Sequence, residues 1–266
     1  MYQTTYHRPS SIDEAASLFA KGSDAKYLAG GHTLIPVMKQ RLASPSDVID
    51  LGKIKELIGI EPSGDGIVIK AATTHYDVAT SDTVKKAIPA LSYLASLIGD
   101  PAVRHRGTIG GSLANNDPAA DYPAAVLALG ATVKTNKRSI SADDFFKGLF
   151  TTALEDGEII TAVSFPVQAK AGYSKFNHPA SRFALTGVFV ARTPGGDVRV
   201  AATGASQNGV MRVSAIEAAL KANWSAGAID GVTISAAGLM SDIHGTSDYR
   251  ANLIKVMAQR AVTAAG

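Results

Sequence analysis

The first third of the chain alternates between apolar residues at helical spacing and short segments rich in β-branched and aromatic residues. Ser11 and Glu14 form a capping box, apolar residues recur through Phe19, and Gly22 ends the pattern, which predicts a helix over residues 12–19. "KYLAG" and "DVIDL" predict strands on either side of a short helix beginning at Thr33. This alternation favours a fold of mixed helices and strands.

The middle of the chain also predicts both helices and strands. "GIVIKAAT" alternates as a strand does, and residues 83–98 have helical spacing that Pro89 should break or kink. The apolar run from Pro123 to Leu129 predicts a helix, followed by paired strands in "ATVKT" and "RSI". "EIITAVSFP" predicts a buried strand stopped at Pro166.

Beyond Pro166 the pattern changes. "GYSKF", "ALTGVFVART" and "DVRVAATGA" predict a meander of antiparallel strands, with "TPGGD" as the hairpin turn between the second and third. Helical patterns follow at residues 214–223 and from Ser247 to the end. We therefore expect a domain boundary near residue 170, with helices and an antiparallel sheet after it.

Composition narrows the class of protein. The 266 residues are 46% hydrophobic and 18% charged, typical of a soluble globular protein, and the net charge is only +3 with scattered basic residues, which argues against nucleic acid as a partner. No apolar run approaches the roughly 20 residues of a transmembrane helix, and the N-terminus lacks an apolar signal core, so we expect a cytoplasmic protein.

The absence of cysteine excludes disulfides, thiolate nucleophiles and cysteine-ligated iron–sulfur clusters within this chain. Electrons in a redox protein of this kind would reside on an organic cofactor or on another chain.

Two glycine-containing stretches carry the candidate chemistry, "AGGHTLIP" at residues 29–36 and "TIGGSLANND" at residues 108–117. Paired glycines let a backbone approach a ligand and turn its N–H groups inward, and Thr33, Thr108 and Ser112 add hydroxyl donors. Two such stretches suit the two sides of a pyrophosphate. The alternative is that both are tight turns between strand and helix. Neither matches G-x-G-x-x-G or a Walker A sequence.

These stretches resemble a known family. "YLAGGHTLIPVMK" and "HRGTIGGSLANNDPAADYPAAVLALGA" are similar to the two flavin-binding signatures of the flavoprotein subunit of molybdenum hydroxylases, and "SDIHGTSDYRANLIKVMAQRAV" resembles that family's closing segment. The resemblance implies an α+β fold. It comprises an FAD-binding domain of the vanillyl-alcohol-oxidase (PCMH) type at residues 1–168, with subdomains of about 1–55 and 56–168, and a smaller α+β domain with an antiparallel sheet at residues 169–266.

The resemblance also implies cofactors and partners. FAD would be bound non-covalently, while [2Fe-2S] clusters and molybdopterin would belong to a small iron–sulfur subunit and a large subunit, in a dimer of heterotrimers. Electrons would pass from molybdenum through the clusters to FAD and on to a quinone, O₂ or NAD⁺. Such an assembly is expected in the cytoplasm, where it can lie peripherally at the inner face of the membrane.

The family signatures assign site residues in this numbering. Around the FAD they place Ala29, Gly30, Gly31, His32, Thr33, Leu34, Ile35, Pro36, Ile98, Thr108, Ile109, Gly110, Gly111, Ser112, Asn116, Asp121, Ile159 or Ile160, Lys175 and Phe183. Ile98 and Phe183 would flank the flavin ring, Ile159 or Ile160 would give it a backbone contact, Lys175 would lie near it, and Asp121 would contact the FAD. His32 could suggest covalent attachment, which the family does not use.

The residue types alone also allow purely structural roles for several of these positions. Asn116 and Asp117 precede Pro118 and could simply form a turn, and Asp121 could be a helix N-terminal charge. Ile98 and Phe183 could be core, and Lys175 a strand lysine with its ammonium at the surface.

Two other functions compete with an electron-transfer subunit. One is a self-sufficient flavin oxidase with its own substrate pocket, and the other is a nucleotide-binding regulatory protein without redox chemistry. The histidines show no metal-ligand spacing and no nucleophile elbow is present, so neither a metal site nor a catalytic residue is predicted.

Overall fold

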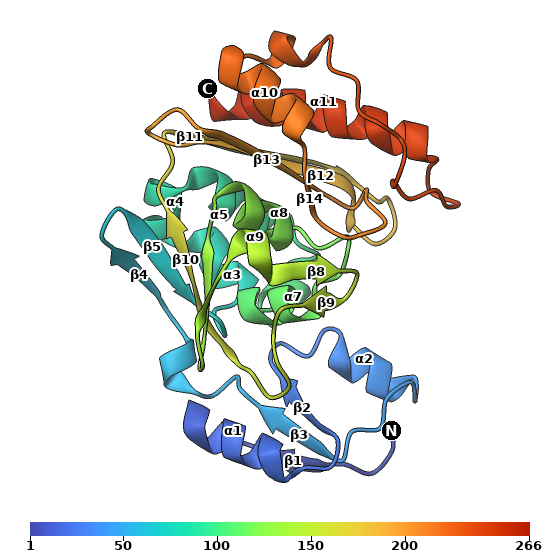
Figure 1. The fold of residues 1–266 in the computed structure, drawn as a ribbon. Helices are drawn as coiled ribbons and strands as arrows, with labels where there is room; N and C mark the ends of the chain where they lie inside the picture. Colours follow the sequence, from blue (N-terminus) through green and yellow to red (C-terminus); the bar gives the residue numbers. More distant parts are fainter.

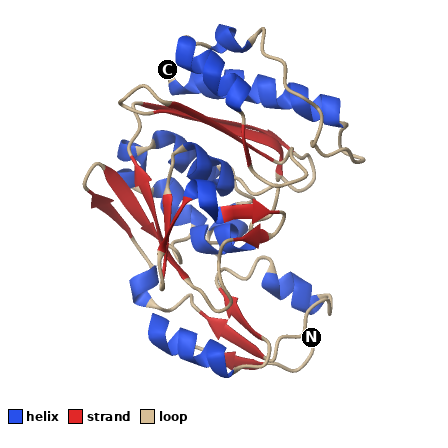
Figure 2. Ribbon diagram, viewed as in Figure 1, coloured by secondary structure: helices blue, strands red, loops and turns tan.

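The structure is a computed structural model that describes residues 1–266. Figure 1 shows three layers of the chain stacked from the N-terminal part at the bottom to the C-terminal part at the top. Helices and strands are mixed in all three, as Figure 2 shows by colour, which confirms the predicted α+β class. None of the helices combines the length and the apolar character that a membrane span requires.

The N-terminal layer is a small parallel sheet with the strand order β1-β3-β2. Its elements are β1 (Thr5–His7), α1 (Ile12–Lys21), β2 (Ala25–Leu28), α2 (Leu34–Lys39) and β3 (Asp47–Asp50). The capping interaction predicted for α1 is present, because the Ser11 hydroxyl accepts from the Glu14 amide at 3.2 Å. α2 begins after Thr33, as expected. A compact apolar cluster that includes Ile49, Ile54 and Leu57 forms the core of this layer.

The middle layer is built on an antiparallel sheet with the order β4-β5-β10-β6-β7. Its strands are β4 (Ile60–Ser63), β5 (Gly66–Lys70), β6 (Thr132–Thr135), β7 (Ser139–Ser141) and β10 (Ile160–Pro166). The helices beside it are α3 (His75–Thr80), α4 (Asp82–Ala87), α5 (Pro89–Ser96), α6 (Pro101–Arg104), α7 (Ile109–Asn115), α8 (Tyr122–Ala128) and α9 (Ala142–Phe145). A short 3₁₀ turn at Lys55–Leu57 leads into this layer, and β8 (Phe146–Gly148) pairs with β9 (Thr151–Thr152) at its side.

Two features of this layer test the sequence-based predictions. The helical pattern of residues 83–98 is broken where expected, since α4 ends at Ala87 and α5 starts at Pro89. The second glycine stretch was not predicted to be helical, yet it forms α7 with Thr108 as its N-cap. Gly110 and Gly111 lie inside this helix, where helix propensity alone disfavours glycine.

The C-terminal layer is an antiparallel sheet with the order β11-β12-β13-β14, covered by helices on its outer face (Figure 1). Its elements are β11 (Lys170–Asn177), β12 (Ala184–Arg192), β13 (Val198–Thr203), β14 (Met211–Arg212), α10 (Ser214–Ala222), a 3₁₀ turn (Ala226–Ile229) and α11 (Ser247–Ala265). The predicted hairpin turn joins β12 to β13, with Thr193 N–H donating to Asp197 O at 2.8 Å.

Strand β12 explains how the upper two layers hold together. It is buried along nearly its whole length, because its two faces belong to different cores. Phe189 and Ala191 pack with the helices of the middle layer, whereas Val188 and Val190 pack against α10 and α11. The strand therefore reads as a continuous apolar run rather than an alternating one. The five-stranded sheet ends at Pro166 and this sheet begins at Lys170. The domain limits of 1–168 and 169–266 remain our prediction.

Candidate flavin site

A cavity of about 620 Å³ lies where the three layers meet. Its lining comes from the N-terminal layer through residues 27–34, from the middle layer through α7 and β10, and from the C-terminal layer through the turn at residues 181–183. A cavity of this size, with half of its lining residues hydrophobic, is typical of a cofactor site.

The first glycine stretch offers the cavity a row of free amides. None of the backbone N–H groups from Ala29 to Leu34 donates a hydrogen bond to another residue. Buried or half-buried amides rarely stay without a partner, and a run of inward-facing amides is a concavity that binds anions. The stretch lies tightly against the chain beyond α6, since a Cβ atom on Gly30 would come within 2.2 Å of the carbonyl oxygen of Arg106. Gly31 has a positive φ of 79°, which glycine adopts without strain.

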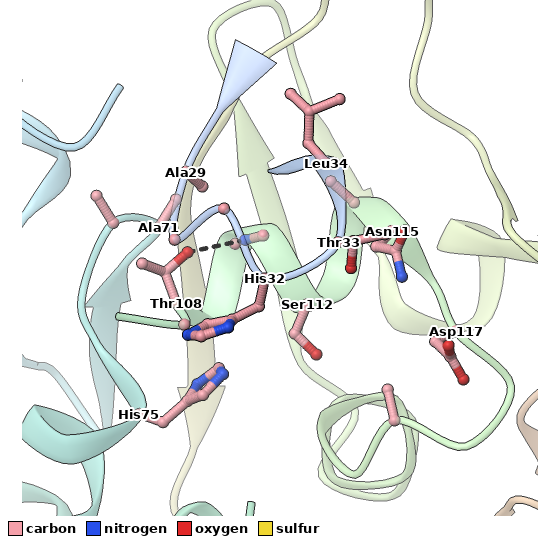
Figure 3. A pocket seen from close by; sticks show the side chains of 18 of the residues that line it. Ala29, His32, Thr33, Leu34, Ala71, His75, Thr108, Ser112, Asn115 and Asp117 are labelled. Carbon is pink, nitrogen blue, oxygen red and sulfur yellow. Dashed lines mark hydrogen bonds between the residues drawn. The ribbon is translucent and has the colours of Figure 1, made fainter. Parts of the chain in front are cut away.

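The second glycine stretch was also expected to direct its amides at a phosphate, but in the structure these amides have partners within the protein. Ile109 and Gly110 donate to the carbonyls of Thr73 and Ala71, at 3.2 and 2.8 Å. The Gly111 amide donates to the Thr108 hydroxyl at 3.1 Å, drawn as the dashed line in Figure 3. These amides are therefore already used. Gly110 is required for packing instead, because a Cβ atom there would lie 2.7 Å from the Ala71 carbonyl oxygen.

Hydroxyl groups remain available beside the free amides. Figure 3 shows the side chains of Thr33 and Ser112 directed into the space between the two stretches, and neither hydroxyl has a hydrogen-bond partner. Asn115 and Asp117 lie further along the same wall. The Asp117 carboxylate also accepts from the Ala119 amide at 2.8 Å, the turn role that its place before Pro118 suggested.

His75 is a lining residue that sequence reasoning missed. Its ring is 5% exposed, faces His32 in Figure 3, and keeps Nδ1 without a hydrogen-bond partner. Burial, with smaller effects of His32 and Arg104, lowers the pKa of His75 to about 3, so the ring is neutral at physiological pH. A lone histidine after two threonines gives no signal in the sequence that would mark it.

Asp121 lies at the cavity wall within a buried cluster that joins two layers. Its carboxylate accepts from the Tyr173 hydroxyl at 2.5 Å and pairs with the Lys175 ammonium at 3.0 Å. Lys175 also donates to the Leu97 carbonyl at 3.0 Å, and its side chain is only 1% exposed. Burial raises the pKa of Asp121, while Lys175 and Tyr173 oppose that rise.

Glu158 closes the cavity from the loop before β10 and has no free oxygen. It accepts from Arg138 Nε at 3.1 Å, from the Thr135 hydroxyl at 2.6 Å and from the Glu155 amide at 2.7 Å. Burial alone would raise the pKa of Glu158, but these donors outweigh it and hold the pKa at about 2. The carboxylate therefore fixes the cavity wall and does not serve as a proton acceptor.

The structure brings most of the residues predicted from sequence into one cavity. The lining includes Ala29, Gly30, Gly31, His32, Thr33, Leu34, Ile98, Thr108, Gly110, Gly111, Ser112, Asp121, Ile159, Ile160 and Phe183. Five predicted residues lie outside the lining, namely Ile35, Pro36, Ile109, Asn116 and Lys175.

The five residues outside the lining have other surroundings. Ile35 and Pro36 lie on exposed positions of α2, and Ile109 is fully buried in the middle core. Asn116 ends α7 in the left-handed conformation, and its amide group donates to the carbonyls of Gly148 and Thr151, both at 2.8 Å. The turn role that the sequence left open for Asn116 is the one this geometry supports.

The other lining residues were not predicted as site residues. They are Tyr27, Leu28, Val37, Leu51, Leu57, Ala71, Ala72, His75, Gly99, Val103, Gly107, Ala114, Asn115, Ala120, Leu154, Glu158, Ser181 and Arg182. Seven of these stand inside the two quoted signatures, namely Tyr27, Leu28, Val37, Gly107, Ala114, Asn115 and Ala120. The rest become neighbours of the cavity only through the tertiary fold.

Comparison with known proteins agrees with this geometry. Residues 2–168 match the model of a family described as the FAD binding domain in molybdopterin dehydrogenase. The chain is 34% identical to the carbon monoxide dehydrogenase medium chain of Hydrogenophaga pseudoflava, covering 98% of this chain and 96% of the relative. It is 35% identical to the nicotine 6-hydroxylase medium subunit of Paenarthrobacter nicotinovorans, with coverage of 98% and 96%.

The likeness extends to three dimensions. A chain in the solved structure of reconstituted CO dehydrogenase from Oligotropha carboxidovorans superimposes with a TM-score of 0.89 at 34% identity, covering 99% of this chain and 97% of that one. The fold and the cavity define a flavin-binding oxidoreductase subunit. The chain belongs to the family of FAD-binding medium subunits of molybdenum hydroxylases.

The cavity fits the FAD that this family binds. A row of unpartnered amides and two free hydroxyls suits a pyrophosphate, and the apolar surfaces of Ile98, Ile160 and Phe183 suit a flat ring system. No cluster of histidine and acidic side chains could hold a metal ion, and the chain has no cysteine for an iron–sulfur cluster.

Proposed function

We propose that this chain is the FAD-carrying electron-transfer subunit of a heterotrimeric molybdenum hydroxylase. It would receive electrons from the [2Fe-2S] clusters of a small subunit and deliver them to an external acceptor such as a quinone, O₂ or NAD⁺. The observation that carries the proposal is the run of free amides at Ala29–Leu34 beside an apolar slot, in a chain without cysteine. The bound FAD would supply the redox chemistry, and the chain's own residues would bind and orient it.

The residues divide into three roles in this proposal. The amides of Ala29–Leu34 and the hydroxyls of Thr33 and Ser112 hold the pyrophosphate. Gly30 and Gly110 allow the backbones on either side of the cavity to approach each other. Ile98 and Phe183 exclude water from the ring, and Phe183, at 49% exposure, stands at the boundary with solvent.

The buried cluster fixes the slot from behind. Lys175 neutralises Asp121 and also holds the Leu97 carbonyl, which immediately precedes Ile98. Its ammonium is therefore committed to these two groups, and we assign it to positioning of the ring-side loop rather than to direct contact with FAD. The substrate hydroxylated by the complex would bind to the large subunit. The names of the relatives refer to different substrates.

Isolation of the chain from its natural source tests the proposal. We expect it to co-purify with iron-containing and molybdenum-containing subunits, in a dimer of heterotrimers, and to carry FAD at one equivalent per chain. The chain expressed alone should bind FAD but show no hydroxylase activity. Substrate oxidation by the chain alone would instead establish a self-sufficient flavin oxidase. The cytoplasmic location predicted from the sequence stays a prediction.

A further inference from the structure

Two histidines from distant parts of the sequence meet beside the mouth of the cavity. His178 lies in the turn between β11 and β12, and His244 lies in the turn that precedes α11, at the same end of the four-stranded sheet (Figure 1). His178 Nε2 and His244 Nδ1 are 3.1 Å apart, and the rings meet edge to face with their centroids at 4.4 Å. Neither residue belongs to the cavity lining or to the two flavin-binding signatures, and His244 lies in the segment that resembles the family's closing segment.

The donors around His178 fix the proton positions in this pair. Its Nδ1 accepts from the amides of Ala180 and Ser181, at 3.3 and 3.2 Å. The proton of neutral His178 must therefore be on Nε2, which donates to Nδ1 of His244. An additional proton on either ring removes one of the acceptors, so the complete arrangement exists only while both rings are neutral.

One side of the pair is anchored in the buried framework. The His244 amide donates to Asp242 Oδ1 at 2.9 Å, and Arg250 Nη2 contacts both oxygens of Asp242, at 2.9 and 2.8 Å. Arg250 is 2% exposed and donates to the carbonyls of Leu185 and Gly204. His244 is thus held in place through a chain of hydrogen bonds to the core.

The other side carries the wall of the cavity mouth. The turn is closed by His178 N–H donating to the Phe183 carbonyl at 2.8 Å and by Arg182 N–H donating to the His178 carbonyl at 2.9 Å. All other hydrogen bonds of residues 179–183 stay inside the turn, so the histidine pair is its side-chain link to the rest of the protein. Arg182 has a φ of 61°, a strained conformation for a residue other than glycine.

We propose that His178 and His244 form a clasp that positions the 178–183 turn, with Phe183 and Arg182, over the mouth of the flavin cavity, and that protonation of the pair releases the turn. This rests on the proposed function for the identity of what the turn covers. The charged groups around the pair are Asp242, which accepts from the His244 amide, Arg250 behind Asp242, and Arg182 in the turn itself.

Limited trypsin digestion tests the clasp without reference to FAD, because trypsin cleaves after Arg182. At neutral pH, His244→Ala should increase cleavage between Arg182 and Phe183 about fivefold, the effect of losing one hydrogen bond worth about 1 kcal/mol. His244→Asn should behave like the wild type, since its side-chain oxygen can replace Nδ1 as the acceptor. His7→Ala, which alters a histidine paired with Asp47 in the N-terminal layer, is the matched control and should leave this cleavage unchanged.

Reoxidation of the reduced FAD-loaded chain by O₂ tests the pH dependence. The wild-type rate should rise as the pH falls from about 7 to about 5, the range in which histidines gain a proton. His244→Asn should show a smaller rise, because only His178 can then gain a proton, and His244→Ala should be fast throughout. Unchanged trypsin cleavage in His244→Ala would overturn the clasp. If His244→Ala is cleaved faster and reoxidised faster but the wild type shows no pH step, release by protonation is overturned. If His244→Ala is cleaved faster but reoxidised at the wild-type rate, the placement of the flavin ring beneath the turn is overturned.

Discussion

Gly30→Ala tests the close approach of the two sides of the cavity. The Cβ atom would lie 2.2 Å from the Arg106 carbonyl oxygen and 2.6 Å from the Gly107 Cα atom, whereas ordinary van der Waals contact begins at 3.4 Å. Both neighbours are backbone atoms, so they cannot rotate away as a flexible side chain can. The first glycine stretch must therefore move from the chain at residues 106–107 by about 1 Å.

The displacement acts on the free amides that follow Gly30. Hydrogen bonds from amides to a charged phosphate are worth about 1.5–3 kcal/mol each, and a shift of this size removes at least one of them. Loss of about 2 kcal/mol corresponds to about thirtyfold weaker FAD binding. The fold should persist, because the core clusters of all three layers lie away from this contact.

Titration of apoprotein with FAD, followed by quenching of flavin fluorescence, gives the dissociation constant. Gly231→Ala is the matched control, since a Cβ atom at Gly231 would meet nothing within 4 Å and its φ is not positive. Circular dichroism checks that both variants fold. If folded Gly30→Ala binds FAD as tightly as the wild type, the first stretch is only a turn and our placement of the pyrophosphate is wrong.

Three further variants address other parts of the site. Gly111→Val should reduce FAD occupancy with little change in circular dichroism, because its Cβ atom would lie 3.0 Å from Thr108 Oγ1 and 3.2 Å from Ala29 Cβ; normal flavin content after purification would contradict this. Phe183→Ala should retain FAD but change its absorbance spectrum and its reoxidation rates with quinone and O₂, and unchanged spectra and rates would make Phe183 an ordinary side chain. Glu158 has a pKa lowered to about 2 in the folded state, so its contribution to stability, on the order of 2 kcal/mol, is present above about pH 4.5 and is lost as the pH falls toward 2. Chemical denaturation of Glu158→Gln across this range should show a flatter acid limb than the wild type, and parallel curves would disprove the coupling.

Much of the secondary structure could be predicted because it depends on neighbouring residues. The Ser11 cap of α1, the break at Pro89 and the hairpin after β12 each follow from the backbone preferences of a few adjacent residues. The second glycine stretch escaped prediction as a helix because its two glycines disfavour one locally. Its first amides are satisfied by Thr73 and Ala71, which are more than thirty residues away in the sequence.

The class of the protein and its cofactor could be predicted because its two glycine stretches and its closing segment resemble those of a known family. Which groups remain free to bind depends instead on contacts between distant parts of the chain. The tertiary structure left the amides of Ala29–Leu34 unpartnered, used those of α7 within the fold, and committed Lys175 to Asp121 and Leu97. Tertiary packing also places His75 and Glu158 at the cavity wall and His178 beside His244, contacts that the sequence does not indicate. The physical reason is that residue type sets what a group can donate or accept, while long-range packing sets which partner reaches it first.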